Sequence, residues 1–409
     1  MEHLDEMLER YAKLVVKQGI HIQPGQSLVV RTGLEAAPFV RKVVEHAYDL
    51  GAKQVHVEWA DEEVQHTRLM KAPEESLKQV PEWRVKGLEQ LAAEGAGFLS
   101  IYSPNPDLFS DVNPERFAIA SRAGQTASRG LNKYIQTDKV SWCVVSVATE
   151  PWAKSLFPEL SAEQALDKLW SLIFMATRVS QDDPEEAWKQ HVQNLQERLA
   201  YLNAFKFREL HYTAPGTDLK VELPEGHIWV GAGAKTPEGT FFLPNIPTEE
   251  VFTLPLKTGV NGVVSSTKPL NYGGKLLENF ELTFENGRIV HVEAESGLEV
   301  LKNLVDTDEG SHFLGEIALV PDNSPISQSN VVFKNTLFDE NASNHLAIGS
   351  AYPTCLTGGE KMNETELAEH GVNTSVVHVD FMIGSAQMNI DAKTADGESI
   401  PLFRNGNWV

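Results

Sequence analysis

The hydrophobic and polar positions follow two different periods in the two halves of the chain. In the first half, short apolar runs alternate with segments in which apolar residues recur every three or four positions. The apolar runs are residues 27–31, 54–60, 97–102 and 141–148. Apolar strands separated by amphipathic helices are typical of a mainly parallel sheet that is covered on both faces. We therefore expect an α/β domain in this half.

The helical segments of the first half have recognisable ends. Gly51 closes the segment that begins near Glu35, and Pro184 stands where a helix would begin after the turn-forming residues 180–183. The expected helices span residues 4–19, 35–50, 83–94, 114–134, 161–179 and 184–205. The last of them marks the end of an N-terminal domain, residues 1–205.

From residue 206 onward the period becomes that of strands. Short alternating segments are separated by Gly and Asn turns, and Asn286-Gly287 is the signal of a tight hairpin. Helical segments are few here, the clearest being residues 297–307 and 364–371. This pattern predicts a second domain, residues 206–409, with an α+β fold rich in antiparallel sheet.

Length and charge narrow the classes of protein that fit. The chain has 409 residues, more than the roughly 250–300 at which a single core stops growing, which favours two domains. Its formal charge is −22, from 35 Lys and Arg against 57 Asp and Glu. Nucleic acids and anionic membranes need a basic surface, so we expect neither as a partner.

The cysteines and the start of the chain favour a cytoplasmic protein. Cys143 and Cys355 are too few for a disulfide scaffold and indicate a reducing compartment. The first residues are acidic and amphipathic and lack the basic and apolar regions of a secretory signal. The sequence also contains no uninterrupted apolar run of about 18 residues.

Side chains with metal-binding chemistry stand in apolar segments of the second half. His378 and Asp380 are two residues apart in a β-rich segment, so on a strand both would leave the same face and could bind one ion. His345 precedes another apolar run, where an unpaired polar group is costly. A catalytic metal needs at least three protein ligands, so others must come from elsewhere in the chain.

Three carboxylates extend this candidate site. Glu250 lies in a loop bounded by prolines, Glu316 lies in an apolar strand, and Glu340 precedes His345 by five residues. Two imidazoles and four carboxylates are enough for two ions, as in many metal-dependent hydrolases. A set without cysteine favours zinc, cobalt, manganese or magnesium. Tyr352 could offer its hydroxyl to an oxyanion formed at such a site.

Each of these residues also has a purely structural interpretation. The pattern His-x-Asp/Glu occurs three times, at His56, His291 and His378, so spacing alone does not identify a ligand pair. The instance at His291 lies beside the expected hairpin, where a solvated strand face explains it. Similarly, Glu316 could be a salt-bridge partner, and Glu340 could precede a helix whose N-terminus favours negative charge.

Two neighbouring residues have simpler explanations. Tyr352 taken alone would be a core or rim tyrosine. Glu249, beside Glu250, is expected to be a surface charge. Motifs of phosphate-binding loops, zincin helices, zinc ribbons and serine-hydrolase elbows do not occur in the sequence.

Four separate segments carry the candidate residues in a fixed order. They are NIPTEEVFT around Glu250, GEIALVP around Glu316, NTLFDENASNHLAIGSAYP across residues 335–353, and NTSVVHVDFMIGS around His378 and Asp380. Together they resemble the thermophilic metalloaminopeptidases of the aminopeptidase T, aminopeptidase S and aminopeptidase II type. The resemblance extends over the whole chain, because the first half is similar to the first domain of that family.

This resemblance implies a two-metal exopeptidase that removes N-terminal residues from peptides with a free N-terminus. It also implies a C-terminal catalytic domain and a homodimer whose subunits enclose the active sites. By motif match the metal ligands would be Glu250, Glu316, His345, His378 and Asp380, with Glu340 as a sixth. Tyr352 would be a catalytic hydroxyl, and Glu316 is our choice for the carboxylate that transfers the proton.

Two positions depart from the family pattern. Asn344 stands where the family often has Cys, and Gln387 stands where an acidic residue is common. Neither change removes an expected ligand, so they bear on substrate preference and on the surroundings of the metals.

Two other functions fit the same residues. The first is a two-metal hydrolase of another bond, such as a phosphoester, although only Lys334 and Lys361 lie close to the motifs in sequence. The second is a non-catalytic protein in which metal stabilises the fold, and such a protein would lose its fold on chelation.

Overall fold

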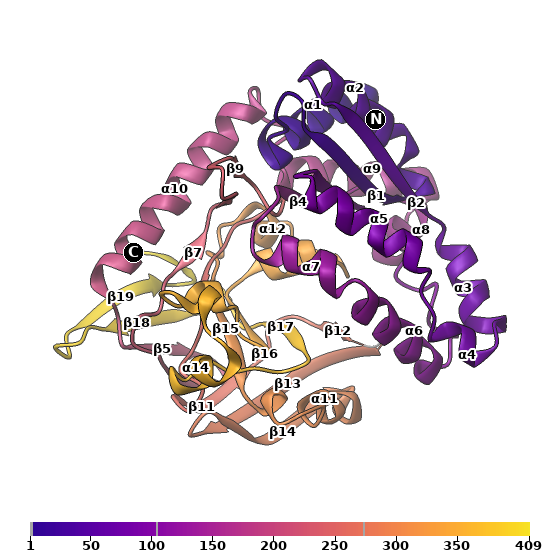
Figure 1. Cartoon of the computed structure of the whole chain (residues 1–409). Coiled ribbons are helices and arrows are strands. Elements are labelled where there is room, and N and C mark those ends of the chain that lie inside the picture. The colour runs from indigo at the N-terminus through magenta and orange to yellow at the C-terminus, as the bar shows by residue number, and fades with distance from the viewer. Residues whose placement is uncertain (1–2, 104, 273–274) are drawn as a thin grey trace. The chain divides into compact units, whose positions relative to one another are not determined.

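The computed structural model describes residues 3–103, 105–272 and 275–409 and divides the chain into two compact units (Figure 1). The first unit contains the chain up to Gln190 together with Gly233–Pro247. The second unit contains His191–Ala232 and Thr248–Val409. Helix α10 (Pro184–Phe205) runs from the first unit into the second, and Gly233–Pro247 later returns to the first.

The first unit is built on a parallel sheet with strand order β2-β1-β3-β4. The strands are β1 (Ser27–Gly33), β2 (Gln54–Ala60), β3 (Gly97–Tyr102) and β4 (Trp142–Ser146). Leu28, Val29 and Val30 of the central strand are fully buried, as expected for a sheet covered on both faces. The predicted α/β fold of the N-terminal half is confirmed. A short pair, β8 (Ala234–Lys235) and β9 (Phe241–Phe242), belongs to the same unit.

Helices connect the strands of the first unit. They are α1 (Leu4–Leu14), α2 (Ala37–Asp49), α3 (Glu62–Lys71), α4 (Glu74–Leu77), α5 (Glu82–Ala93), α6 (Pro114–Ala127), α7 (Arg129–Gln136), α8 (Glu150–Leu156) and α9 (Ala162–Ala176). The start of α9 is fixed by a capping box, in which the side chains of Ser161 and Gln164 each accept a hydrogen bond from the other's backbone N–H.

Some helices differ from the sequence prediction. The single helix expected at 114–134 is two helices, because Ser128 leaves the helical range at φ −81° and ψ 1°. Helices α3, α4 and α8 were not predicted, although α3 and α8 have local start signals. The Asp61 side chain accepts a hydrogen bond from Val64 N, and the Thr149 side chain accepts one from Trp152 N.

The larger sheet of the second unit is antiparallel. Its strand order is β12-β13-β11-β6-β5-β18-β19-β20, and β14 pairs with β13. The strands are β5 (Glu209–Ala214), β6 (Thr217–Glu222), β11 (Val260–Ser265), β12 (Leu270–Tyr272), β13 (Lys275–Glu285), β14 (Arg288–Ser296), β18 (Asn389–Lys393), β19 (Ser399–Arg404) and β20 (Asn407–Trp408). The predicted hairpin forms between β13 and β14, with Asn286 and Gly287 both at positive φ.

The smaller sheet of the second unit is also antiparallel, with strand order β17-β16-β15-β10-β7. Its strands are β7 (Val230–Gly231), β10 (Val251–Thr253), β15 (Leu314–Leu319), β16 (His345–Gly349) and β17 (His378–Met382). Ile317, Leu346 and Phe381 belong to the hydrophobic core of the unit, and the Phe381 ring lies 5.5 Å from that of Phe280 on β13. Because side chains alternate along a strand, the residues between these core positions point to the opposite face.

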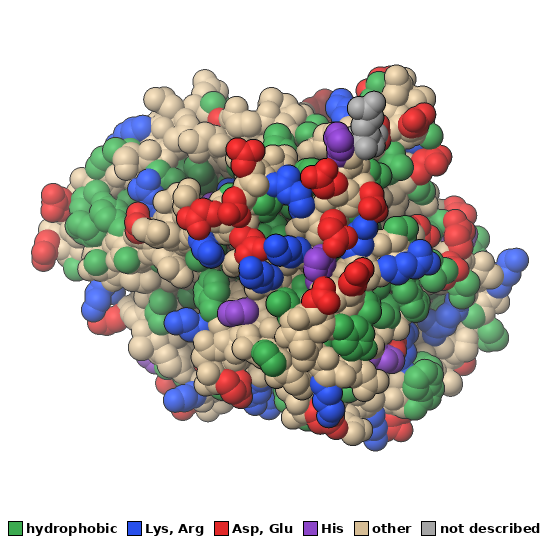
Figure 2. All heavy atoms as spheres, turned by 90° about the horizontal axis from the view of Figure 1, so that it is seen from above, with side chains coloured by type: hydrophobic (Ala, Val, Ile, Leu, Met, Phe, Trp, Pro, Cys, Tyr) green, Lys and Arg blue, Asp and Glu red, His purple; other side chains and the backbone are tan. Residues whose placement is uncertain are grey.

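The remaining helices of the second unit are short. They are α11 (Leu298–Val305), α12 (Pro325–Gln328), α13 (Thr336–Asp339) and α14 (Glu364–Glu369). Across the described parts of the chain, no helix is both long and apolar enough to cross a membrane. Cys143 and Cys355 are both free and buried. Figure 2 shows Lys and Arg side chains interspersed among Asp and Glu on one face of the molecule.

Gly349 ends β16 at a point where only glycine fits. Its φ is +111°, and a Cβ atom there would overlap the carbonyl oxygen of Val377, the residue before β17. Gly349 and His378 are register partners, so this close approach sets the position of His378. Gly397 offers a matched comparison, because its φ is +83° but open space surrounds its Cβ position.

We expect Gly349→Ala to lower the free energy of unfolding by about 3 kcal/mol or more. Alanine is strained at this positive φ, and its Cβ atom would also overlap the carbonyl oxygen of Val377. Gly397→Ala should cost only about 1–2 kcal/mol, because it adds the conformational penalty alone. Urea unfolding of both variants measures the difference. Equal losses would show that the close approach of the two strands is not the constraint.

Candidate metal centre

Five of the predicted site residues come from four neighbouring strands of the smaller sheet. His378 and Asp380 lie on β17, His345 starts β16, Glu316 lies on β15, and Glu250 directly precedes β10. The strand order brings these positions together although they span residues 250–380 of the chain. The predicted convergence of Glu250 and Glu316 with the two histidines is therefore present in the structure.

Small residues separate the polar side chains on this face of the sheet. Ala347 is the register partner of both Glu316 and Asp380, so it stands between these two carboxylates. Ala318 is the register partner of His345. Alanine at these central positions leaves room above the sheet for the long side chains to turn toward one another.

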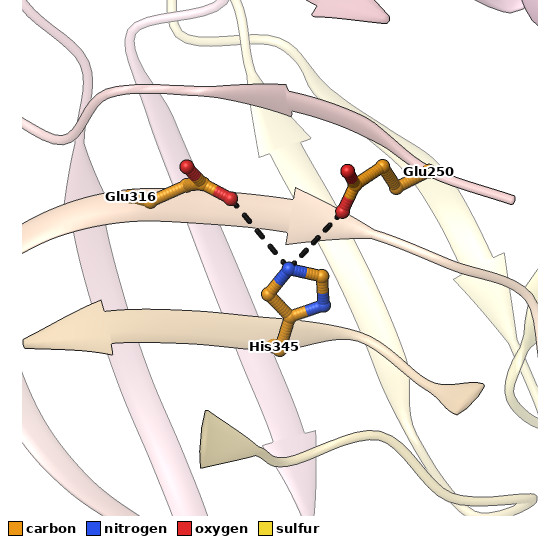
Figure 3. A group of neighbouring side chains, drawn as sticks. All are labelled: Glu250, Glu316 and His345. Carbon is orange, nitrogen blue, oxygen red and sulfur yellow. Dashed lines mark ion pairs between the residues drawn. The ribbon is translucent and has the colours of Figure 1, made fainter. Parts of the chain in front are cut away.

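The polar side chains form two groups that share Glu316. In the first, His345 Nε2 lies 3.2 Å from Glu250 Oε2 and 3.5 Å from Glu316 Oε1 (Figure 3). In the second, His378 Nε2 lies 3.6 Å from Glu316 Oε2 and 3.4 Å from Asp380 Oδ1. Each Glu316 oxygen thus faces a different histidine, and each histidine also faces a second carboxylate.

Backbone carbonyls fix the orientation of both imidazole rings. His345 Nδ1 lies 3.1 Å from the carbonyl oxygen of Ser343, and His378 Nδ1 lies 2.7 Å from that of Ser350. A carbonyl oxygen only accepts, so Nδ1 carries the proton in each ring. In the neutral ring Nε2 then presents a lone pair to the carboxylates. This is the usual arrangement of a histidine that binds metal through Nε2.

The carboxylates of the two groups are incompletely satisfied. Within the described residues, Glu250 Oε2 and Asp380 Oδ1 are buried and accept no hydrogen bond. Buried carboxylate oxygens that face lone pairs of nitrogen repel them unless a metal ion or a proton lies between. Oxygen and imidazole donors without thiolate suit zinc, cobalt, manganese or magnesium. The residues present therefore fit divalent metal ions.

The other two His-x-Glu pairs behave differently. His56 Nε2 lies 2.8 Å from Glu58 Oε1, and Arg84 binds the other oxygen of Glu58. His291 Nε2 lies 2.9 Å from Glu293 Oε1 on an exposed strand face. In each of these pairs the histidine forms a direct hydrogen bond with its glutamate. Among the described residues, Asp380 Oδ1, which faces His378, accepts no hydrogen bond. Chemical context separates three patterns that spacing alone did not.

Glu340 and Tyr352 border the two groups. Glu340 is half-buried at the end of α13, and its pKa is raised well above its usual range by burial and then by the charges of Glu250 and Asp380. The Tyr352 ring lies 4.8 Å from that of His378 and is 41% exposed. Desolvation and then the nearby carboxylates raise the pKa of the Tyr352 phenol, so it keeps its proton.

One neighbour of the site was misjudged from the sequence. Glu249 is buried at 4% exposure and is not a surface charge. Its backbone N–H donates to Asn341 Oδ1 at 2.7 Å, and its side chain lies 3.6 Å from His191 Nε2. Asn341 is completely buried and fixes the backbone beside Glu250. The short polar run around residue 341, which lies between apolar segments, is the sequence signal that could have indicated these buried polar contacts.

The protonation of the groups depends on their mutual contacts. Burial raises the pKa of Glu316 to about 6, with Asp380 and Glu250 adding to the rise and the two histidines opposing it. Burial alone would lower the pKa of His378, but Asp380 and Glu316 outweigh it and raise that pKa to about 9. The pKa of His345 is raised in the same way by Glu250 and Glu316. Without another cation, the rings themselves hold protons that offset the carboxylates.

Comparison with known proteins gives matches over the full length of the chain. The sequence model of the family described as thermophilic metalloprotease (M29) matches residues 4–408. The chain is 54% identical to Aminopeptidase AmpS of Bacillus subtilis over 409 residues, covering 100% of both chains. It is 50% identical to Aminopeptidase 2 of Geobacillus stearothermophilus, covering 100% of this chain and 99% of the relative. The structure of wild-type AmpT from Thermus thermophilus matches with a TM-score of 0.94 and 42% identity, covering 99% of each chain.

We expect metal binding to release protons, and its affinity to rise with pH. The pKa of His378 is about 9 in the folded chain, against 6.5 for a free histidine, so below pH 9 a metal ion must displace a proton from this ring. The stability of the metal-free protein has the opposite pH dependence, because it falls as the pH rises. The raised pKa stabilises the fold fully below pH 6.5, and this stability is lost between pH 6.5 and 9.

Calorimetric titration of chelator-treated protein with Zn²⁺, in two buffers of different ionisation enthalpy, counts the protons released. His378→Ala is the control and should release fewer. Zero release at pH 7.5 would contradict a site in which metal replaces these protons.

Proposed function

The chain belongs to the family of thermophilic metalloproteases (M29), and we propose that it hydrolyses peptides with two divalent cations bound at the two His–carboxylate groups. Its relatives are named aminopeptidases, so the chain is a metal-dependent exopeptidase. The family resemblance inferred from the four sequence segments is confirmed. These matches favour peptide hydrolysis over the phosphoester hydrolase and the non-catalytic metal protein considered from sequence.

The position of Glu316 between both histidines is the single observation that supports two cations. One position would be formed by Glu250, Glu316 and His345, the other by Glu316, His378 and Asp380. Glu316 belongs to both sets and would help to hold both cations. Zinc, cobalt, magnesium or manganese all suit these donors, and the cell's supply decides among them.

When bound, a pair of divalent cations polarises the scissile carbonyl and makes water acidic enough to attack near neutral pH. Tyr352 keeps its proton and is placed beside His378, so it would donate a hydrogen bond to the oxyanion that develops on the substrate. The free α-amino group of a peptide would be bound by a carboxylate or by one of the cations, and the acidic set of side chains offers both.

For the proton carrier we propose a different residue from the one chosen from the sequence. Glu316 faces a histidine with each of its oxygens, so as a bridging ligand it would have no oxygen free for proton transfer. Glu340 belongs to neither group of ligands, yet it interacts electrostatically with both. Burial, and then the charges of Glu250 and Asp380, raise its pKa, so Glu340 holds a proton more readily than a free carboxyl group does. We therefore assign the proton carrier to Glu340, in place of the sixth-ligand role expected from sequence.

We also propose that the protein acts in the cytoplasm as a homodimer. Its two free, buried thiols support a reducing compartment. The homodimer follows from the family resemblance, and sedimentation analysis of the full chain tests it.

We expect cleavage of peptides with a free N-terminus and loss of cleavage on N-acetylation, since acetylation removes the free amino group that a carboxylate or a cation would bind. The loss in kcat/KM should be about 30-fold or more, the cost of leaving buried charges without their partner. Assays of matched free and acetylated peptides with added Zn²⁺, Co²⁺ or Mg²⁺ measure it, and chelator-treated protein is the blank. Equal cleavage of both peptides would contradict the exopeptidase activity.

We expect Glu340→Gln to lower kcat by about 10²–10⁴-fold, the usual contribution of a proton carrier, while two ions remain bound. Metal analysis of the purified variant, combined with its pH–rate profile, checks both parts. Glu360→Gln, at an exposed residue of the same unit, is the control and should leave both unchanged. Loss of an ion in Glu340→Gln would return Glu340 to the ligand set.

A further inference from the structure

The His378 ring is oriented by one residue at the end of β16. His378 Nδ1 donates to the carbonyl oxygen of Ser350 at 2.7 Å. Ser350 N donates in turn to the carbonyl oxygen of Val377, the residue before His378, at 2.8 Å. Ser350 therefore fixes both the ring and the backbone that carries it.

Asn373 holds the chain on both sides of Ser350. It is completely buried, and its Nδ2 donates to the carbonyl oxygen of Gly349 at 2.6 Å and to that of Gly310 at 2.8 Å. The backbone carbonyl oxygen of Asn373 accepts a hydrogen bond from Ala351 N at 2.9 Å. A single buried amide residue thus joins the end of β16 to the short 3₁₀ turn at Gly310–His312.

Asp308 fixes the loop that leads from Asn373 into β17. Its Oδ1 accepts from Ser311 N and from Ser375 Oγ, each at 2.8 Å, and its Oδ2 accepts from Val376 N at 2.7 Å. The Val376 side chain is 79% exposed, so apolar packing does not hold this part of the loop. Hydrogen bonds to a carboxylate are stronger than bonds between neutral groups, so these bonds hold the backbone that leads to His378 in place.

The other group of ligands is anchored by different residues. His345 Nδ1 donates to Ser343 O, and Asn341 Oδ1 accepts from Glu249 N beside Glu250. None of these residues takes part in the hydrogen bonds of Asp308 and Asn373 described above. The two groups share only the Glu316 side chain.

We propose that Asp308 and Asn373 are positioning residues that set the affinity of the cation position formed by His378 and Asp380, and not of the position formed by Glu250 and His345. This inference rests on the proposed two-cation function. Metal–ligand distances tolerate only about 0.2 Å of error, so a loop that lets His378 shift weakens one position selectively.

The test is a calorimetric titration of chelator-treated, full-length protein with Co²⁺. The parent should bind two ions, and Asp380→Asn identifies which binding event belongs to the His378 position. Asp308→Ala should weaken that same event by about 10–100-fold, the usual effect of losing a group that orients a ligand. The other event should change less than about threefold. The Co²⁺ absorption spectrum of the weakened event should change as well, because its coordination is altered.

Two variants serve as matched comparisons. Asn341→Ala should weaken the other event, because Asn341 lies on the Glu250 side. Asp306→Ala should leave both events unchanged, since the Asp306 side chain is 71% exposed and lies 3.6 Å from His312 Nε2. If circular dichroism shows that Asp308→Ala is unfolded, Ser375→Ala is used instead. It removes one bond to Asp308 and the bond that Val377 N donates to Ser375 Oγ, and it should weaken the same event several-fold.

The outcomes separate this inference from the function on which it rests. Equal weakening of both events by Asp308→Ala or Ser375→Ala, or weakening of neither, would overturn the selective positioning while leaving two cations in place. A parent protein that binds a single Co²⁺ ion would overturn the two-cation function itself, and the selective positioning with it.

Discussion

The buried carboxylate of Glu316 between two imidazoles is the interaction on which the rest of the structure depends. Its oxygens lie 3.5 and 3.6 Å from different histidines, and its neighbours Glu250 and Asp380 each have a buried oxygen without a hydrogen bond among the described residues. Burying so much negative charge is unfavourable unless cations offset it. The apolar packing of the opposite sheet face supplies the stability that holds these groups together.

Much of the fold could be predicted from the periods of the sequence. Apolar runs in the first half indicated a parallel sheet, and Asn286-Gly287 indicated the hairpin of β13 and β14, because both signals are local. Helices α3 and α8 were missed, because few of their residues are buried, Leu69 in α3 and Trp152 and Ala153 in α8, and their capping residues are the main local signal. The return of Gly233–Pro247 to the first unit had no local signal, since it depends on contacts between distant segments.

The candidate site was more predictable than its surroundings. Histidines and carboxylates in apolar segments are costly, so His345, Glu316 and Asp380 stood out from the sequence. That they bind metal remains a prediction, although the structure brings them together. Glu249 and Asp308 were not identifiable in the same way. Their positions depend on a buried amide and on backbone groups far along the chain, and neither leaves a pattern in the sequence around them.

The strand order of the smaller sheet has a consequence for the protein during its own synthesis. β17 lies at one edge of the sheet and is the last of its strands to leave the ribosome. A nascent or truncated chain that stops before β17 lacks His378 and Asp380, so it would not complete the second of the two proposed cation positions. On the proposed mechanism, peptide trimming would therefore begin only after β17 has been synthesised.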